Sequence, residues 1–432
     1  MGRKVIQMAD NFKDLKWYSQ FFRKCSKCGT CKSAYSYGPP PTNATICPQG
    51  EYFKLDSYYG SRAKSFLGQA ILENRVDLTD PAIQEDMQKA VFSCTVCGGC
   101  QTQCQLDYKP WIIDYIEEMR HNLVNRGIGP TKAEKIYQDK VIKDHNPYGE
   151  THSSRFNWLK DVRNLKTDGN TVYFAGCTAS YRRTEIAKST ASVLTKLGED
   201  WAVMGENEYC CGSPLLRAGL REEPQKLAEH NVDYLNDHGF KTIVTACAGC
   251  YKVLAKEYEK WWGLKLKAKV LHTSQYLEEK MKKGELKLSS VPATVTYHDP
   301  CHMGRHMNHY EVDMEGKKQW KGSYIQIDKP GLYETPRNVL KAIPGIQFKE
   351  MYRNRDNSFC CGAGGGIKAS YPDVALETAK TRIKEAEGLD GVQKMVTPCP
   401  FCVTNLGDAT KALGSKVEVV DLIQLVDQAL KK

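Results

Sequence analysis

Two stretches of the sequence place adjacent cysteines before a glycine, and they point to metal chemistry. "YCCGSPLLRAG" occupies residues 209–219 and "FCCGAGGGIKA" occupies residues 359–369. The chain has 18 cysteines among 432 residues. A disulfide framework is typical of small secreted domains, and this chain is neither small nor preceded by the apolar segment of a signal peptide. The cysteine spacings therefore favour thiolate ligation of metal.

Eight cysteines near the N-terminus have the spacing of two iron-sulfur clusters. "CSKCGTC" (25–31) and "CTVCGGCQTQC" (94–104) each carry a CxxCxxC run. Such a run places three thiolates around one small loop, and in two-cluster ferredoxins the fourth cysteine binds the other cluster. Zinc is the alternative, but zinc sites are built mostly from CxxC pairs. We predict two [4Fe-4S] cubanes with these ligands: Cys25, Cys28, Cys31 with Cys104, and Cys94, Cys97, Cys100 with Cys47.

The other ten cysteines divide equally between two halves of the chain that repeat one another. They are Cys177, Cys210, Cys211, Cys247 and Cys250 in one half, and Cys301, Cys360, Cys361, Cys399 and Cys402 in the other. In each half one cysteine stands at a predicted strand end, and a CxxC pair opens a predicted helix. Ligands would then converge at the carboxyl ends of parallel strands, where helix N-termini lower thiol pKa values. A cubane takes four ligands, so five leave either a spare thiol or a cluster of another shape.

The elements that carry these ten cysteines alternate between strand and helix. "NTVYFAGC" (170–177) and "ATVTYHDPC" (293–301) are predicted strands, and later strands run into "CAGC" and "CPFC", which begin helices. A polar helix follows each CCG loop, and each half closes on a strand and a helix. This alternation indicates parallel sheets. Residues 311–334 are expected to be an insertion in the second copy.

The N-terminal part shows helical spacing instead, for example over residues 60–76 and 109–127. The prediction is therefore an α+β multidomain chain. A helical ferredoxin-like domain with two cubanes spans residues 1–165, and two repeated α/β domains with short parallel sheets span residues 166–290 and 291–432.

With these motifs the chain resembles a known family. "GC…CCG…CAGC" and "HDPCHMGR…CCG…CPFC" are similar to the CCG domains of the catalytic subunit of heterodisulfide reductase. With the ferredoxin part in front, nearly the full chain resembles the D-type subunit, and also the iron-sulfur subunits of glycolate and lactate oxidases. The resemblance implies that each five-cysteine set holds a noncubane [4Fe-4S] cluster. It also implies reductive cleavage of a disulfide or similar small-molecule substrate, with electrons arriving singly along the cubanes.

A second hypothesis uses the same clusters only to relay electrons. The chain would then be a subunit of a flavin-dependent 2-hydroxyacid or acyl-CoA-linked oxidoreductase complex, and would hand electrons to or from quinone or ferredoxin. No flavin motif occurs in the sequence, so a flavoprotein or other redox subunit is the expected partner. "CGAGGGI" does not provide a dinucleotide motif either, because Ile367 stands where the last glycine is required.

Composition bears on location and on nucleic-acid binding. No apolar run approaches the length of a membrane-spanning helix, so we expect a cytoplasmic protein whose membrane association would come through a membrane-bound partner. The net charge of +10 is scattered without a basic block. Metal-bound thiolates would offset much of this charge, so a zinc-dependent nucleic-acid binder is the less favoured third hypothesis and no nucleic-acid partner is expected.

Four histidines surround Cys301 in "HDPCHMGRHMNH", namely His298, His302, His306 and His309. Their density would suit zinc, but a position beside a cluster is the preferred interpretation. His298 and His302 are the candidates for donating a hydrogen bond or a proton to bound sulfur.

Overall fold

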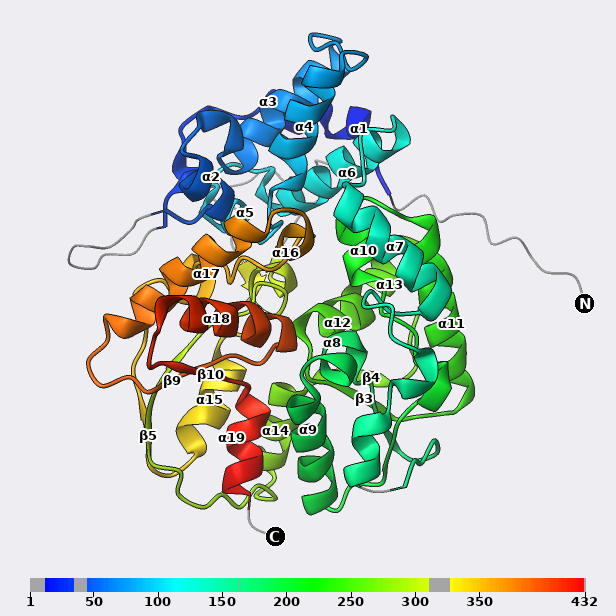
Figure 1. Ribbon diagram of the computed structural model, residues 1–432, viewed down its shortest axis with the longest axis vertical. Coiled ribbons are helices and arrows are strands. Elements are labelled where there is room, and N and C mark those ends of the chain that lie inside the picture. Colours follow the sequence, from blue (N-terminus) through cyan, green and yellow to red (C-terminus); the bar gives the residue numbers. More distant parts are fainter. Residues whose placement is uncertain (1–11, 35–44, 163, 311–326, 431–432) are drawn as a thin grey trace, which may run out of the picture.

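The computed structural model describes residues 12–34, 45–162, 164–310 and 327–430. A helical N-terminal region lies across the upper ends of two α/β units, which stand side by side (Figure 1). Residues 35–44 and most of the expected insertion, residues 311–326, lie outside the described residues. The described end of that insertion forms β7 (Ile327–Lys329), which pairs antiparallel with β6 (His309–Tyr310).

The N-terminal region is built from helices. They are α1 (Leu15–Phe22), α2 (Pro48–Phe53), α3 (Gly60–Leu72), α4 (Pro81–Phe92), α5 (Gly99–Gln103), α6 (Ile112–Asn125) and α7 (Lys132–Asp144). Of these, α1, α3, α4 and α6 contribute to one buried apolar cluster. Helix α4 begins where the Asp80 carboxylate accepts the Ala82 backbone N–H at 2.8 Å, and Thr131 and Glu134 form a capping box on α7. The helical content agrees with the expectation, whereas a ferredoxin-like domain stays a prediction.

The first α/β unit follows in strand and helix alternation. Its strands are β1 (Thr171–Tyr173), β2 (Trp201–Ala202), β3 (Thr242–Thr245) and β4 (Lys269–His272). Its helices are α8 (Gly176–Tyr181), α9 (Thr184–Lys196), α10 (Ser213–Arg217), α11 (Glu222–Asp237), α12 (Ala248–Lys252), α13 (Tyr258–Trp262) and α14 (Thr273–Lys282), with a π-helical turn (Val253–Glu257) between α12 and α13.

The second unit repeats this plan. Its main strands are β5 (Ala293–Tyr297), β8 (Ile346–Phe348), β9 (Lys394–Val396) and β10 (Glu418–Val420). Its helices are α15 (Glu334–Ala342), α16 (Ile367–Ser370), α17 (Pro372–Glu387), α18 (Pro400–Leu413) and α19 (Leu422–Ala429). The sheets have orders β2-β1-β3-β4 and β8-β5-β9-β10, and every pair in them is parallel. The predicted short parallel sheets and the repeat of the two halves are confirmed.

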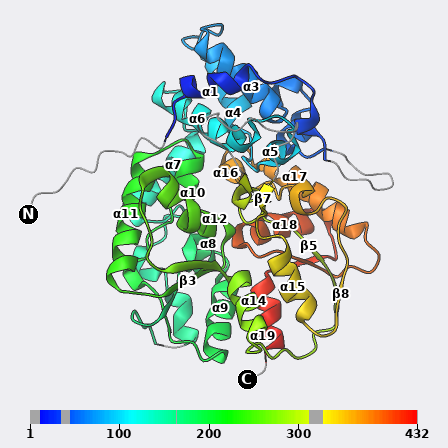
Figure 2. The same cartoon turned by 180° about the vertical axis from the view of Figure 1, so that it is seen from behind.

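The two α/β units share a core. Helix α9 packs on α19 and α14 packs on α15, as the view from behind shows (Figure 2). Tyr173, Val295 and Val426 belong to one buried apolar cluster that spans both units. Lys196 Nζ adds an ion pair to Asp427 at 2.9 Å. Because burying apolar surface is the main stabilising contribution, this shared core fixes the two halves against each other.

Candidate metal centres

All 18 cysteines are free thiols, and burial separates them into groups. Fourteen are buried, Cys25, Cys247 and Cys301 are half-buried, and Cys28 alone is exposed. Buried free thiols gathered at several points of one chain are suited to bind soft metal ions.

The five cysteines of the first half lie in one row of neighbouring side chains. The thiol of Cys210 interacts with those of Cys177 and Cys211, and Cys250 interacts with Cys211 and Cys247. Strand order explains this convergence. Cys177 follows β1, and Cys247 follows the neighbouring β3 and is the N-cap residue of α12.

One detail of the strand prediction is wrong. Strand β1 ends at Tyr173, and Cys177 lies in the first turn of α8 rather than at a strand end. The chain turns at Gly176, whose φ is +73°, and a Cβ atom at that position would lie 2.8 Å from the Cys250 sulfur. The glycine therefore brings the backbone close to the thiols and turns it into the helix before the cysteine is reached.

The second half repeats the row with equivalent residues. Cys360 interacts with Cys301 and Cys361, and Cys402 interacts with Cys399 and donates to the Cys361 sulfur at 3.3 Å. Here also Cys301 lies in the turn after β5 rather than on the strand. The predicted opening of a helix by CxxC holds, because Cys399 is the N-cap residue of α18.

The glycine of each CCG motif has a steric explanation. Gly212 and Gly362 have φ values of +84° and +88°, in the left-handed region. A Cβ atom on Gly362 would lie 2.6 Å from the Ala375 carbonyl oxygen, and one on Gly212 would lie 3.0 Å from Pro224 Cβ. The Gly362 N–H points at the Cys360 sulfur at 3.4 Å. Glycine is thus needed to turn the paired cysteines inward.

The two rows meet at the boundary between the halves. The side chains of Cys247 and Cys399 are in contact, so all ten thiols form one continuous series. The His302 ring reaches the same boundary, because a Cβ atom on Gly249 would lie 3.5 Å from its Nδ1 and 3.7 Å from the Cys247 sulfur.

The eight N-terminal cysteines lie in two neighbouring groups. Cys104 is close to Cys28 and Cys31, although these residues are more than seventy positions away in sequence. Cys47 is close to Cys94 and Cys100. This placement suits the predicted pairing, in which each CxxCxxC loop takes its fourth ligand from a distant cysteine. The ligand assignment itself stays a prediction.

The second cysteine loop, residues 94–104 with the second CxxCxxC run, packs against the second α/β unit. The Cys97 thiol interacts with that of Cys360, and His306 Nε2 lies 2.8 Å from the Val96 carbonyl oxygen. A Cβ atom on Gly365 would lie 2.6 Å from the Cys94 carbonyl oxygen. The glycines of "CGAGGGI" after Gly362 therefore allow the backbone of this segment to lie directly against the backbone of the second cysteine loop.

Burial and thiol-to-thiol hydrogen bonds shift the pKa values of the cysteines in opposite directions. Burial raises the pKa of Cys47 to about 12, and burial raises that of Cys104 to about 11. Thiol-to-thiol hydrogen bonds act the other way, since Cys360 lowers the pKa of Cys97 to about 5 and Cys210 lowers that of Cys211 to about 6. Several thiolates cannot remain buried side by side without a compensating positive charge, and iron in a cluster would supply it.

The histidines around Cys301 have different surroundings. His298 forms a compact group with Cys361 and Cys402, and its Nδ1 accepts from Arg382 Nε at 3.2 Å. His302 and His306 form a similar group with Cys301, and burial lowers the pKa of His302 to about 3, so this ring is neutral at neutral pH. His309 is exposed and pairs with Asp328. Both possible zinc groups would use cysteines of a five-cysteine set, which disfavours a separate zinc site.

Buried arginines beside the thiols were missed in the sequence. Arg155 Nη2 points at the Cys177 sulfur at 3.5 Å and its Nη1 pairs with Glu208 at 3.0 Å. Arg305 lies beside Cys97, Cys301 and Cys360. A basic residue four positions after Cys301 was the available signal for Arg305, whereas nothing near Cys177 in sequence indicated Arg155.

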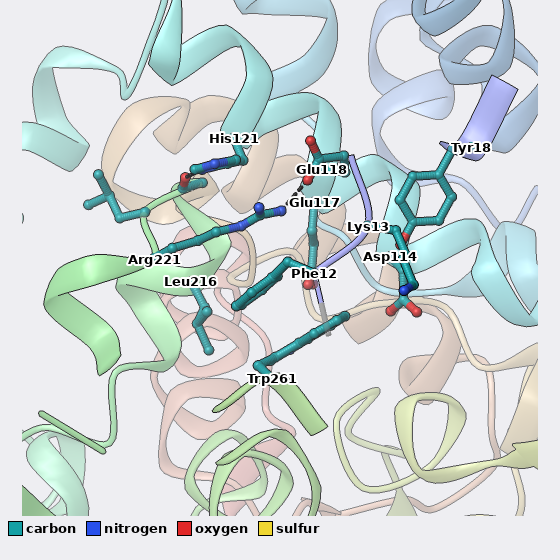
Figure 3. A pocket seen from close by; sticks show the side chains of 12 residues that line it. Phe12, Lys13, Tyr18, Asp114, Glu117, Glu118, His121, Leu216, Arg221 and Trp261 are labelled. Atoms are coloured by element: carbon teal, nitrogen blue, oxygen red, sulfur yellow. Dashed lines mark hydrogen bonds and ion pairs between the residues drawn. The ribbon is translucent and has the colours of Figure 1, made fainter. Parts of the chain in front are cut away.

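A pocket away from the cysteines lies where α1, α6 and the first α/β unit join (Figure 3). The Phe12 ring stacks on Trp261 with centroids 4.6 Å apart, and Arg221 lies over Phe12 and pairs with Glu118. Its lining contains no cysteine among the described residues. We attribute it to packing at this junction.

Within the described ranges, no helix is both long and apolar enough to cross a membrane.

Comparisons with known proteins agree with the cysteine pattern. Residues 171–255 and 295–407 match the family model described as CCG, cysteine-rich domain. The chain is 34% identical over 415 residues to the D-type subunit of the dihydromethanophenazine:CoB–CoM heterodisulfide reductase of Methanosarcina mazei, covering 94% of this chain and 93% of that protein. The corresponding protein of Methanosarcina acetivorans is 35% identical over 416 residues, with the same coverage of both chains. EtfAB:quinone oxidoreductase of Syntrophomonas wolfei is 27% identical over 98% of this chain and 60% of its own length.

Proposed function

Because the chain belongs to the family of the D-type subunits of heterodisulfide reductase, it is an iron-sulfur oxidoreductase subunit, and we propose that it cleaves a small disulfide reductively between its two five-cysteine sets. The reaction is RS–SR′ + 2e⁻ + 2H⁺ → RSH + R′SH. The observation that carries this proposal is the contact between Cys247 and Cys399, which brings two equivalent thiol rows to one boundary.

The residues divide among four proposed clusters. Two cubanes would use the eight N-terminal cysteines in the exchanged pairing given above, and each five-cysteine set would hold one noncubane [4Fe-4S] cluster. When bound, such groups supply single-electron transfer and, at the two sets, iron that can take a substrate sulfur. The fit rests on the converging buried thiols and on the CCG glycines that turn them inward.

Burial indicates where a substrate would enter. Cys247 and Cys301 are the half-buried members of their sets, while the other eight are buried. His302 lies beside Cys301 and reaches the Cys247 side of the boundary. We assign the disulfide to this boundary, with one sulfur facing each set. His298 remains a candidate for supplying a proton to a leaving thiol, and the neutral His302 ring is a candidate for donating a hydrogen bond to bound sulfur.

The test is thiol release by the iron-loaded chain under strict anaerobiosis. Reduced methyl viologen would serve as the donor, and a small mixed aliphatic disulfide as the substrate. We expect release that is lost in Cys399→Ser and retained in Cys28→Ser, because the small donor can reduce the inner clusters without the exposed loop. A fully iron-loaded wild-type chain that releases no thiol above the blank would contradict the proposal.

A second candidate is supported by the similarity to EtfAB:quinone oxidoreductase over 98% of this chain. In that case the chain relays electrons between a flavoprotein and a quinone or ferredoxin, with a membrane-bound partner as one form of the complex. Chemical reduction followed by rapid electron delivery to a quinone analogue, without thiol release, would favour this candidate. Both functions require a redox partner, and co-purification of the native complex would identify it.

A further inference from the structure

A buried arginine lies where the second cysteine loop meets the second α/β unit. Arg305 is 2% exposed, and its Nη1 donates to the Ser358 carbonyl oxygen at 2.7 Å. Its Nε and Nη2 are buried without a hydrogen-bond partner among the described residues. Buried guanidinium donors are normally satisfied, so two unpartnered ones indicate a missing acceptor.

The surroundings identify what that acceptor would be. Cys97, Cys301 and Cys360 are the groups whose charges act most strongly on Arg305. A Cβ atom on Gly98 would lie 3.7 Å from the Arg305 Cβ, which places the arginine directly against the second cysteine loop. Cys97 belongs to that loop, whereas Cys301 and Cys360 belong to the second five-cysteine set. The guanidinium therefore faces ligands of two proposed clusters at once.

The equivalent arginine of the first half, Arg155, has a carboxylate partner. Arg155 also lies beside the leading cysteine of its set, but the Glu208 carboxylate pairs with it at 3.0 Å and both side chains are fully buried. The positive charge beside Cys177 is thus neutralised by a carboxylate. Among the described residues no carboxylate forms an ion pair with Arg305, and the charges that act most strongly on it are those of Cys97, Cys301 and Cys360.

From this asymmetry we infer that Arg305 is a positioning residue that raises the reduction potentials of two proposed clusters. One is the cubane on the loop with Cys94, Cys97 and Cys100 (the second-loop cluster), and the other is the cluster of the second five-cysteine set (the second-half cluster). Its two unpartnered donors would bind cluster sulfur, and its charge would stabilise the reduced, more negative state of both groups. This inference rests on the proposed cluster content.

The test is a potentiometric titration of the full iron-loaded chain, followed by electron paramagnetic resonance. We expect Arg305→Gln to lower the midpoint potential of the second-loop and second-half clusters. The shift should be at least tenfold in the reduction equilibrium, about 59 mV for one electron. The cluster on the Cys25–Cys31 loop should keep its potential. Arg305→Lys keeps the charge but not the fork of donors, and should shift the same two clusters by less.

The matched control is the double variant Arg155→Gln/Glu208→Gln, which removes one positive and one negative charge from the first half. It should leave the midpoint potentials of the second-loop and second-half clusters near those of the wild type. Unchanged potentials in an iron-replete Arg305→Gln chain, or equal shifts in all clusters, would overturn the inference. If Arg305→Gln does not retain iron, the titration is done on Arg305→Lys instead. An Arg305→Lys chain in which the potentials of the second-loop and second-half clusters do not shift, or in which other clusters shift as well, contradicts the inference. Failure of the cluster proposal is distinguishable, since it appears as low iron in the wild type before any titration.

Discussion

Replacing Gly362 by alanine tests whether the CCG motif is required by the geometry seen around the second set. Gly362 has a φ of +88°, and its added Cβ would lie 2.6 Å from the Ala375 carbonyl oxygen and 2.8 Å from Thr378 Cβ. The left-handed conformation costs a residue with a Cβ roughly 1–2 kcal/mol. The contact with α17 is to backbone that cannot rotate away, and overpacking of this kind adds about 1–3 kcal/mol.

Two other glycines separate these contributions. Gly391 has a φ of +69° and open space around its Cβ direction, so Gly391→Ala should show only the conformational cost. The destabilisation by Gly212→Ala should fall between the other two, because the added Cβ would lie 3.0 Å from Pro224 Cβ. Destabilisation is therefore expected to be smallest for Gly391→Ala, larger for Gly212→Ala and largest for Gly362→Ala.

Urea unfolding and iron content of the purified chains provide the measurement. Gly362→Ala should have the lowest urea midpoint and should lose the irons of the second set, because Cys360 and Cys361 precede Gly362 directly and would be displaced with it. Gly391→Ala should keep its full iron content. A Gly362→Ala chain that matches Gly391→Ala in both midpoint and iron would refute this account of why glycine follows the paired cysteines.

Three further outcomes follow from the proposed clusters. Iron analysis should give about 16 Fe per chain and little zinc, since four clusters carry four irons each, and a reproducible value near eight in a fully reconstituted sample would leave only the cubanes. Cys47→Ala should damage the cluster on the 94–100 loop, and loss of the 25–31 cluster instead would show that pairing is local; paramagnetic resonance separates the two. Cys361→Ala and Cys211→Ala should each remove or convert one five-cysteine cluster, with a loss of up to about four irons, while both cubane signals persist. Normal iron and a full set of signals in Cys361→Ala would contradict the ligand role of the paired cysteines.

The repeated α/β plan was predictable because local signals agreed with one another. Apolar runs of strand length led into CxxC pairs, and polar helices followed each CCG loop, so periodicity and turn chemistry favoured the same architecture. The structure confirms it with two parallel sheets of matching strand order. The domain boundaries at 165 and 290 stay predictions, although β1 begins at Thr171 and β5 at Ala293.

Contacts between distant segments could not be read from the sequence. The contact of Cys97 with Cys360 joins loops more than 250 positions apart, and no local pattern links them. The same holds for the difference between Arg155 and Arg305, because it depends on whether a carboxylate from another segment reaches the guanidinium. Such pairings depend on how the units pack, which neither spacing nor periodicity specifies.

One side chain shows how that packing is fixed at the centre of the molecule. Arg120 of α6 is fully buried, and its Nη2 donates to the Cys94 carbonyl oxygen at 2.6 Å. Its Nη1 donates to the Gly365 carbonyl oxygen at 2.8 Å and to the Arg217 carbonyl oxygen at 2.5 Å. A single guanidinium thus joins the second cysteine loop to both α/β units. Because charge-assisted hydrogen bonds to buried carbonyls hold a defined geometry, Arg120 helps to fix the second cysteine loop, where a cubane is proposed, against both α/β units.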